Sequence, residues 1–170
     1  SGLAVGSSPR LQRMSLPFAL NHINLWLLRD CIDGVEGWSI VDCCIHRDEA
    51  KAQWESIFAN ELQGLPILRV IVTHMHPDHI GLAHWLCERW NVRLWISATD
   101  YQVARLGCLG PTGFGGDRAA EYFASHGLNS PEAVEQIKGR TGYFPSLVPS
   151  VPPQYRRLMD GMVLTIGGRG

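Results

Sequence analysis

The amino-acid sequence predicts a mixed α/β domain in which helices cover an outer face of one sheet. Two observations predict it. Short apolar, β-branched runs alternate with segments of helical periodicity, and a cluster of metal-binding side chains directly follows one of the apolar runs. Ligands gathered where strands end are typical of sheets flanked by helices. At 170 residues, of which 45% are hydrophobic, the chain is long enough to bury one core.

The first part of the chain predicts an arm, two paired strands and a helix. Residues 1–16 are rich in Gly, Ser, Pro and Arg, which predicts a flexible N-terminal arm, or a strand only at its end. A strand over residues 22–29 is followed by turn residues at 33–37, and a second strand over 38–45 would complete a hairpin. Residues 47–62 have helical periodicity. The apolar face of this helix comprises Trp54, Ile57, Phe58 and Leu62.

The following elements continue this alternation and then change character. We expect a strand at 67–73, a helix at 79–90, a strand at 92–97 and a short helix at 98–106. Residues 107–157 are rich in Gly and Pro and contain no strand-like run, so they predict an insert of short helices and loops. Within the insert, the short helices are expected over residues 119–126 and 131–138.

The densest cluster of chemically useful side chains follows the third predicted strand. His74, His76, Asp78 and His79 lie within six residues. Because side chains alternate along a strand, His74 and His76 project to the same side, and Pro77 turns the backbone where the strand stops. Imidazole and carboxylate donors are what a borderline cation such as zinc requires. A single histidine here would ordinarily be a packing or surface residue, but four donors this close together predict a metal site.

The segment Thr73-His74-Met75-His76-Pro77-Asp78-His79-Ile80-Gly81 resembles the HxHxDH signature of the metallo-β-lactamase superfamily, in particular its hydroxyacylglutathione hydrolase-like members. Residues 21–28, 38–42 and 92–97 resemble strands of that family, and the resemblance resumes at 160–168. It implies a four-layer αββα sandwich built from two similar βα halves.

On this resemblance, the chain supplies mainly the first βα half. We expect a domain over residues 17–170 that is incomplete at its C-terminus, with 107–157 as its helical and loop insert. The family's remaining metal ligands belong to the second half and have no counterpart here. Half a sandwich would leave one apolar sheet face exposed. A further C-terminal segment or a second copy in a homodimer is expected to cover that face.

The resemblance also implies a role for each residue of the motif. His74 and His76 would bind a first metal, and Asp78 and His79 a second. With only one metal, Asp78 would instead act in catalysis by orienting the nucleophilic water. The implied cofactor is Zn2+, one or two ions, with Fe or Mn as alternatives.

Two further residues are implied to support this centre. Asp42 would orient a ligand histidine or the motif loop, and Thr73 would hydrogen-bond beside it. The alternative for Asp42 is an aspartate that merely closes a strand in a turn. In the insert, the aromatic side chains predict either an apolar substrate pocket or simple anchoring of the insert on the core. These residues are Phe114, Tyr122, Phe123, Tyr143 and Phe144.

Charge and composition narrow the class of function. The net charge of −1 gives no field that would attract nucleic acid or an anionic membrane. Five cysteines without CxxC spacing, and no apolar run of membrane-spanning length, predict a cytoplasmic protein. We therefore expect a metal-dependent hydrolase of a small-molecule ester, thioester or lactone. The alternatives are an oxidoreductase similar to mononuclear-iron persulfide dioxygenases, which carry the same motif, and a catalytically inert half-domain.

Overall fold

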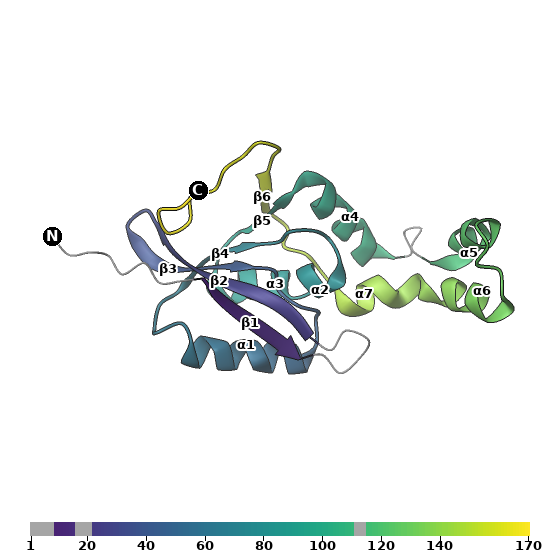
Figure 1. Cartoon of the computed structure of the whole chain (residues 1–170), viewed down its shortest axis with the longest axis horizontal. Helices are drawn as coiled ribbons and strands as arrows, with labels where there is room; N and C mark the ends of the chain where they lie inside the picture. The colour runs from purple at the N-terminus through teal and green to yellow at the C-terminus, as the bar shows by residue number, and fades with distance from the viewer. Residues whose placement is uncertain (1–8, 16–21, 111–114) are drawn as a thin grey trace.

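The computed structural model describes residues 9–15, 22–110 and 115–170, and the described part of the chain contains one six-stranded sheet (Figure 1). The strands lie side by side in the order of the sequence. The first three pair antiparallel, and the later ones pair parallel. Their bounds are β1 Arg10–Ser15, β2 His22–Ile32, β3 Val35–Val41, β4 Ile67–Ile71, β5 Leu94–Ser97 and β6 Tyr155–Leu158.

Helices connect the parallel strands, because a parallel pair requires a crossover longer than a turn. This mixed architecture of sheet and helices confirms the predicted fold class. No helix of the described residues is long and apolar enough to cross a membrane. The helices are α1 Asp48–Asn60, α2 Pro77–Ile80, α3 Ala83–Trp90, α4 Ala98–Leu109, α5 Gly116–Ser125, α6 Pro131–Lys138 and α7 Tyr143–Leu147, with a 3-10 turn η1 at Gly139–Gly142.

The hairpin between β2 and β3 turns at Asp33 and Gly34, both with positive φ (52° and 80°). A two-residue turn with both residues in this region matches the twist of the flanking strands. Glu36 and Gly37, expected in the connection, instead belong to β3, which pairs them with β2. The strand expected to run to residue 45 ends at Val41, because Asp42 adopts a left-handed backbone conformation (φ 66°).

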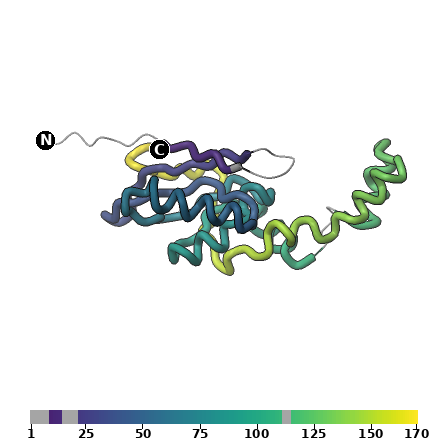
Figure 2. The backbone as a smooth tube through the Cα atoms, turned by 90° about the horizontal axis from the view of Figure 1, so that it is seen from below, coloured from purple at the N-terminus to yellow at the C-terminus, as the bar shows by residue number. Residues whose placement is uncertain are grey.

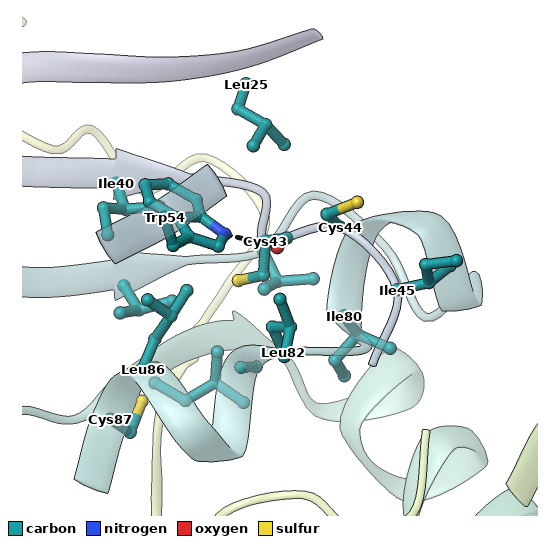
Figure 3. Close-up of a cluster of buried hydrophobic side chains, with 14 of the residues drawn as sticks. Leu25, Ile40, Cys43, Cys44, Ile45, Trp54, Ile80, Leu82, Leu86 and Cys87 are labelled. Atoms are coloured by element: carbon teal, nitrogen blue, oxygen red, sulfur yellow. Dashed lines mark hydrogen bonds between the residues drawn. The ribbon is translucent and has the colours of Figure 1, made fainter. Parts of the chain in front are cut away.

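The hydrophobic core lies between the sheet and the helices (Figure 3). Trp38 and Trp54 are both fully buried, and the Trp54 indole nitrogen donates to the Cys43 carbonyl at 2.9 Å. Cys43 and Cys44 are free and fully buried. They therefore act as small core residues.

The opposite face of the sheet is more open at the β1–β2 edge. Along β2, Ile23, Leu25 and Leu27 are buried, whereas the residues between them are exposed. Trp26 is 42% exposed and lies opposite Leu11 of β1, which is 47% exposed. This edge therefore presents apolar side chains to solvent.

A buried charged group joins the C-terminal segment to the sheet. Arg69 of β4 donates to the Asp30 carboxylate of β2 at 2.6 and 2.9 Å, and Ser39 of β3 also donates to it. Arg69 further donates to the Thr165 carbonyl at 2.9 Å, and the Gly167 amide donates to Asp30 at 3.3 Å. Burial raises the pKa of Asp30, but these donors more than offset it and leave that pKa below its ordinary value.

Helices α5 and α6 form an arm that projects from the body of the molecule beyond α4 and α7 (Figures 1 and 2). The arm has its own small cluster of buried side chains, separate from the main core. Ala119 and Ala120 of α5 pack there against Ile137 of α6, with Val134 beside them. Each of the two helices therefore buries part of its apolar face against the other.

Of the two alternatives left open for the N-terminal arm, the structure shows a strand at its end, because Arg10–Ser15 form β1. Two other expectations need correction. The predicted insert over 107–157 contains a strand, because β6 pairs with β5 from Tyr155 onward. The helix expected over 79–90 is two helices. It breaks because the Leu82 amide donates to Cys44, and the His79 carbonyl accepts from Cys43, in place of bonds within one helix.

Candidate metal centre

The predicted metal ligands lie where the backbone leaves the C-terminal end of β4. The amide of Val72 still donates to Trp95 at 2.9 Å, after which the chain turns through residues 73–76. His76 is the N-cap of α2, and Pro77 is its first residue, where a missing amide hydrogen costs nothing. The short helix then carries Asp78 and His79 back toward the preceding histidines.

The structure brings the four predicted ligands together. The ring centroid of His74 lies 4.6 Å from that of His76 and 4.0 Å from that of His79. Nε2 of His74 lies 3.0 Å from Nδ1 of His76, and Nε2 of His79 lies 3.3 Å from Oδ2 of Asp78. Three imidazoles and one carboxylate therefore share one partly exposed spot on the surface.

Asp42 supports this cluster from the end of β3. Its carboxylate accepts the Thr73 amide at 2.9 Å and the Thr73 hydroxyl at 3.0 Å. Its Oδ2 also lies 2.9 Å from Nδ1 of His79, and Thr73 Oγ1 lies 3.0 Å from Nδ1 of His74. Both contacts occupy Nδ1 and leave Nε2 of each ring for other partners. Asp42 is thus more than the end of a strand.

The carboxylates also set the protonation of the cluster. The hydrogen bond to Asp42, followed by that to Asp78, raises the pKa of His79 from 6.5 to about 9. The hydrogen bond from His79 in turn lowers the pKa of Asp78. Burial, together with the neighbouring His79 and His76, lowers the pKa of His74. Without a metal, His79 therefore carries a positive charge at neutral pH.

The donors fit a transition metal in kind and in pairwise spacing. Two ligands of one tetrahedral zinc ion lie about 3.3 Å apart, given Zn–N bonds of about 2.0–2.1 Å. The contacts of His74 with His76 and of Asp78 with His79, at 3.0 and 3.3 Å, are close to that value. As the side chains stand, the described residues contain no group of three or more His, Cys, Asp or Glu arranged to hold an ion. The side chains would therefore have to move before these donors could surround one ion.

The backbone around the motif is fixed by contacts that sequence reasoning missed. Asp100 of α4 accepts the Met75 amide at 3.1 Å, and its other oxygen lies 2.5 Å from Oγ of Ser97. The signal was present, because Ser97 and Asp100 have the spacing of a helix N-terminal capping box. Gly81 has a similar effect: a Cβ there would lie 2.6 Å from the Cα of Ile45, so only glycine lets α2 approach that segment.

A cavity of about 420 Å³ opens beside the motif. Of the predicted pocket residues, Phe123, Tyr143 and Phe144 line it, Tyr122 does not, and Phe114 lies outside the described residues. Sequence reasoning missed Arg140 of η1, because nothing local in the sequence places it near the motif. The full lining is Met75, His76, Pro77, Phe123, Arg140, Tyr143 and Phe144.

Comparisons with known proteins identify the superfamily to which this fold belongs. Residues 20–142 match the family model of the metallo-beta-lactamase superfamily. The crystal structure of a beta-lactamase domain protein from Burkholderia ambifaria is 48% identical, with a TM-score of 0.78, and the match covers 98% of this chain and 44% of that one. A metallo-beta-lactamase family protein from Thermus thermophilus is 25% identical, with a TM-score of 0.64, over 94% of this chain and 48% of that one.

A third solved structure, of TTHA1623 in a di-iron-bound form, is 19% identical with a TM-score of 0.50, over 89% of this chain and 56% of that one, and shows a likeness of fold alone. No curated protein matches the chain. The chain spans less than half the length of the Burkholderia and Thermus structures.

Proposed function

The chain belongs to the metallo-β-lactamase superfamily, and we propose that it forms the histidine-bearing part of a metal-dependent hydrolase of small esters, thioesters or lactones. Within that class we propose thioesters of the kind that hydroxyacylglutathione hydrolases cleave. One observation carries the proposal. His74, His76, Asp78 and His79 meet at the end of β4, and Asp42 holds His79 by its Nδ1.

In the proposed mechanism, His74 and His76 would hold one metal ion through Nε2 and Nδ1, the nitrogens that face each other. Asp78 and His79 would hold a second ion; with a single ion, Asp78 would orient the attacking water. A bound ion would lower the pKa of its water toward about 7 and polarise the scissile carbonyl. Asp42 keeps the Nε2 of His79 directed at the centre, and Thr73 does the same for His74.

We propose zinc as the resident metal, because imidazole and carboxylate donors at tetrahedral spacing suit it. The same donors also accept iron or manganese, and availability contributes to the choice. The structure of TTHA1623 in its di-iron-bound form shares only the fold, so iron enters here as an outcome to be tested.

The remaining ligands are proposed to come from a second βα half packed on the open face of the sheet. That face carries Leu11 and Trp26, which are 47% and 42% exposed. The solved structure from Burkholderia ambifaria, of which this chain matches 44%, contains ample further chain for such a half.

The test combines elemental analysis by mass spectrometry with thioester hydrolysis. We expect zinc in the purified protein, and we expect His76→Ala to lose both metal and turnover. His84→Ala is the matched control, because His84 lies on α3, pairs with Ser150 and Glu88, and is outside the cluster. Iron in the protein, together with oxygen consumption in the presence of a persulfide, would mean that the function is that of an oxidoreductase and not of a hydrolase. If the protein contains no metal and shows no turnover even after zinc is added, the chain is a catalytically inert half-domain.

A further inference from the structure

We infer that the cavity beside His76 selects substrates that carry a carboxylate, which Arg140 binds across an apolar spacer. The reaction step of this inference rests on the proposed hydrolase function, whereas the binding step rests on the cavity. His76 and Arg140 line the same space, which places the recognition of charge and the proposed chemistry within one ligand. Its volume of about 420 Å³ suits a small molecule.

Aromatic side chains form the spacer region of the cavity. Phe144 is 7% exposed and packs on α4 at Gly107, where a Cβ would lie 2.6 Å from the ring. Phe123 and Tyr143 are 41% and 58% exposed, although aromatic rings are ordinarily among the more buried residues. They line the cavity with Phe144 and can cover an alkyl or aryl group.

Arg140 brings the cation to this apolar cavity. Its backbone is fixed, because Gly115 packs so closely that a Cβ there would lie 2.6 Å from the Arg140 carbonyl carbon. The cations of the neighbouring arm have acidic partners: Lys138 pairs with Asp117 and Glu135, and Arg118 pairs with Glu121.

The guanidinium of Arg140 makes no ion pair and no side-chain hydrogen bond within the described ranges. It is therefore available to a ligand.

A carboxylate is the anion that this arrangement favours. The planar guanidinium offers two parallel N–H donors to one carboxylate, which gives both charge and orientation. With the carboxylate held by Arg140 and the spacer between the aromatic rings, the rest of the ligand is directed toward His76. Substrates with an uncharged end would bury the same spacer but gain no ion pair.

Binding to the metal-free protein tests the site without catalysis. The probes are the mono-anilide of adipic acid and the anilide of hexanoic acid, amides that differ at the far end of the acyl chain. We expect the carboxylated anilide to bind about tenfold more tightly, the value of one charge-assisted contact at an exposed site. Arg140→Ala should abolish that preference, Arg140→Lys should retain part of it, and Arg118→Ala is the matched control on the arm. Equal affinities for both anilides, unaffected by Arg140→Ala, would overturn the inference.

Turnover by the metal-loaded protein tests the same site in the reaction. The parent substrate is the phenyl thioester of hexanoic acid, compared with derivatives that carry a carboxylate on the acyl chain or on the phenyl ring. We expect Arg140→Ala to raise KM about tenfold more for one of these derivatives than for the parent, with a smaller effect on kcat.

The outcomes separate this inference from the proposed function. Turnover of the parent with no carboxylate preference in either derivative would refute the role of Arg140 and leave the hydrolase intact. Selective binding of the carboxylated anilide with no turnover of any thioester would refute the hydrolase and leave the binding site intact.

Discussion

Replacing Asp42 with asparagine should change how metal affinity depends on pH. The Asp42 carboxylate accepts from Nδ1 of His79 at 2.9 Å and from Thr73 at 2.9 and 3.0 Å. Asparagine keeps the shape and one acceptor oxygen, so the Thr73 amide can remain bonded. It loses the negative charge, and its nitrogen can only donate.

In the native protein, the size of the pH dependence of metal affinity follows from the proton that His79 carries. Its pKa is about 9, so at pH 7 only about one His79 in a hundred is neutral. A metal binds the neutral imidazole and displaces the proton, so affinity rises with pH. The expected rise is about tenfold per pH unit from about pH 7 to about pH 9, where it levels off.

In Asp42→Asn the pKa of His79 falls toward 6.5, its ordinary value, although Asp78 retains part of the shift. The rise with pH should therefore level off at lower pH. Above about pH 9, where His79 is neutral in both proteins, the lost orientation should weaken binding by about 10- to 100-fold. Near pH 7 the two effects oppose each other, so the difference there should be smaller.

Competition with a chromophoric chelator, followed from about pH 6 to about pH 10, measures both curves over the range in which histidine titrates here. Asp48→Asn is the matched control, because the Asp48 side chain is 99% exposed and lies outside the cluster. Parallel curves for the native protein and Asp42→Asn, offset by a constant, would refute the role of Asp42 in setting the protonation of His79.

Three other substitutions test the framework around the centre. Arg69→Met should lower the free energy of unfolding by about 3–5 kcal/mol, because it leaves the fully buried Asp30 carboxylate without its cation. The double variant with Asp30→Leu should recover much of this loss, and denaturant titrations measure both variants. Gly107→Ala should destabilise the protein by about 1–2 kcal/mol, because the new Cβ would lie 2.6 Å from the Phe144 ring. This loss is expected although alanine has a better helix propensity than glycine, and thermal unfolding measures it. Asp100→Ala should weaken metal binding about tenfold by freeing the motif amide that it holds, as calorimetric titration would show.

Each of these has an outcome that would contradict it. A double variant no more stable than Arg69→Met would mean that the unpaired charge is not the cause. Gly142→Ala is the control for Gly107, since a Cβ at Gly142 meets nothing within 4 Å, and an equal loss in both would exclude the ring contact. Metal affinity unchanged in Asp100→Ala would mean that the loop is held by its other bonds.

The sequence was sufficient where the signal is local. The strand that precedes the motif and the turn at Pro77 follow from residue type and spacing. The grouping of the four donors then follows from the turn. The assignment of a role to Asp42 needed the family resemblance, because Asp42 lies 31 residues before Thr73, to which it is hydrogen-bonded. The metal itself and the role of each ligand stay predictions.

What the sequence did not predict depends on contacts between distant segments. The break between α2 and α3 arises because Cys43 and Cys44 take backbone bonds that one continuous helix would have used. β6 was missed because its strand has only four residues and follows a proline-rich stretch. Arg140 reaches the cavity only because of where η1 is placed, which no local pattern in the sequence records.

The separate cluster in the arm divides the stability of the molecule into two parts. Because Ala119, Ala120 and Ile137 belong to no other core, the arm can open without exposing the residues beneath the sheet. Amide hydrogens of α5 and α6 should then exchange with solvent through a local opening of lower free energy than the opening that exposes those of β2–β4. A small molecule can thus enter or leave the cavity when the arm opens. The loop that carries the predicted metal ligands meanwhile stays protected by the main core.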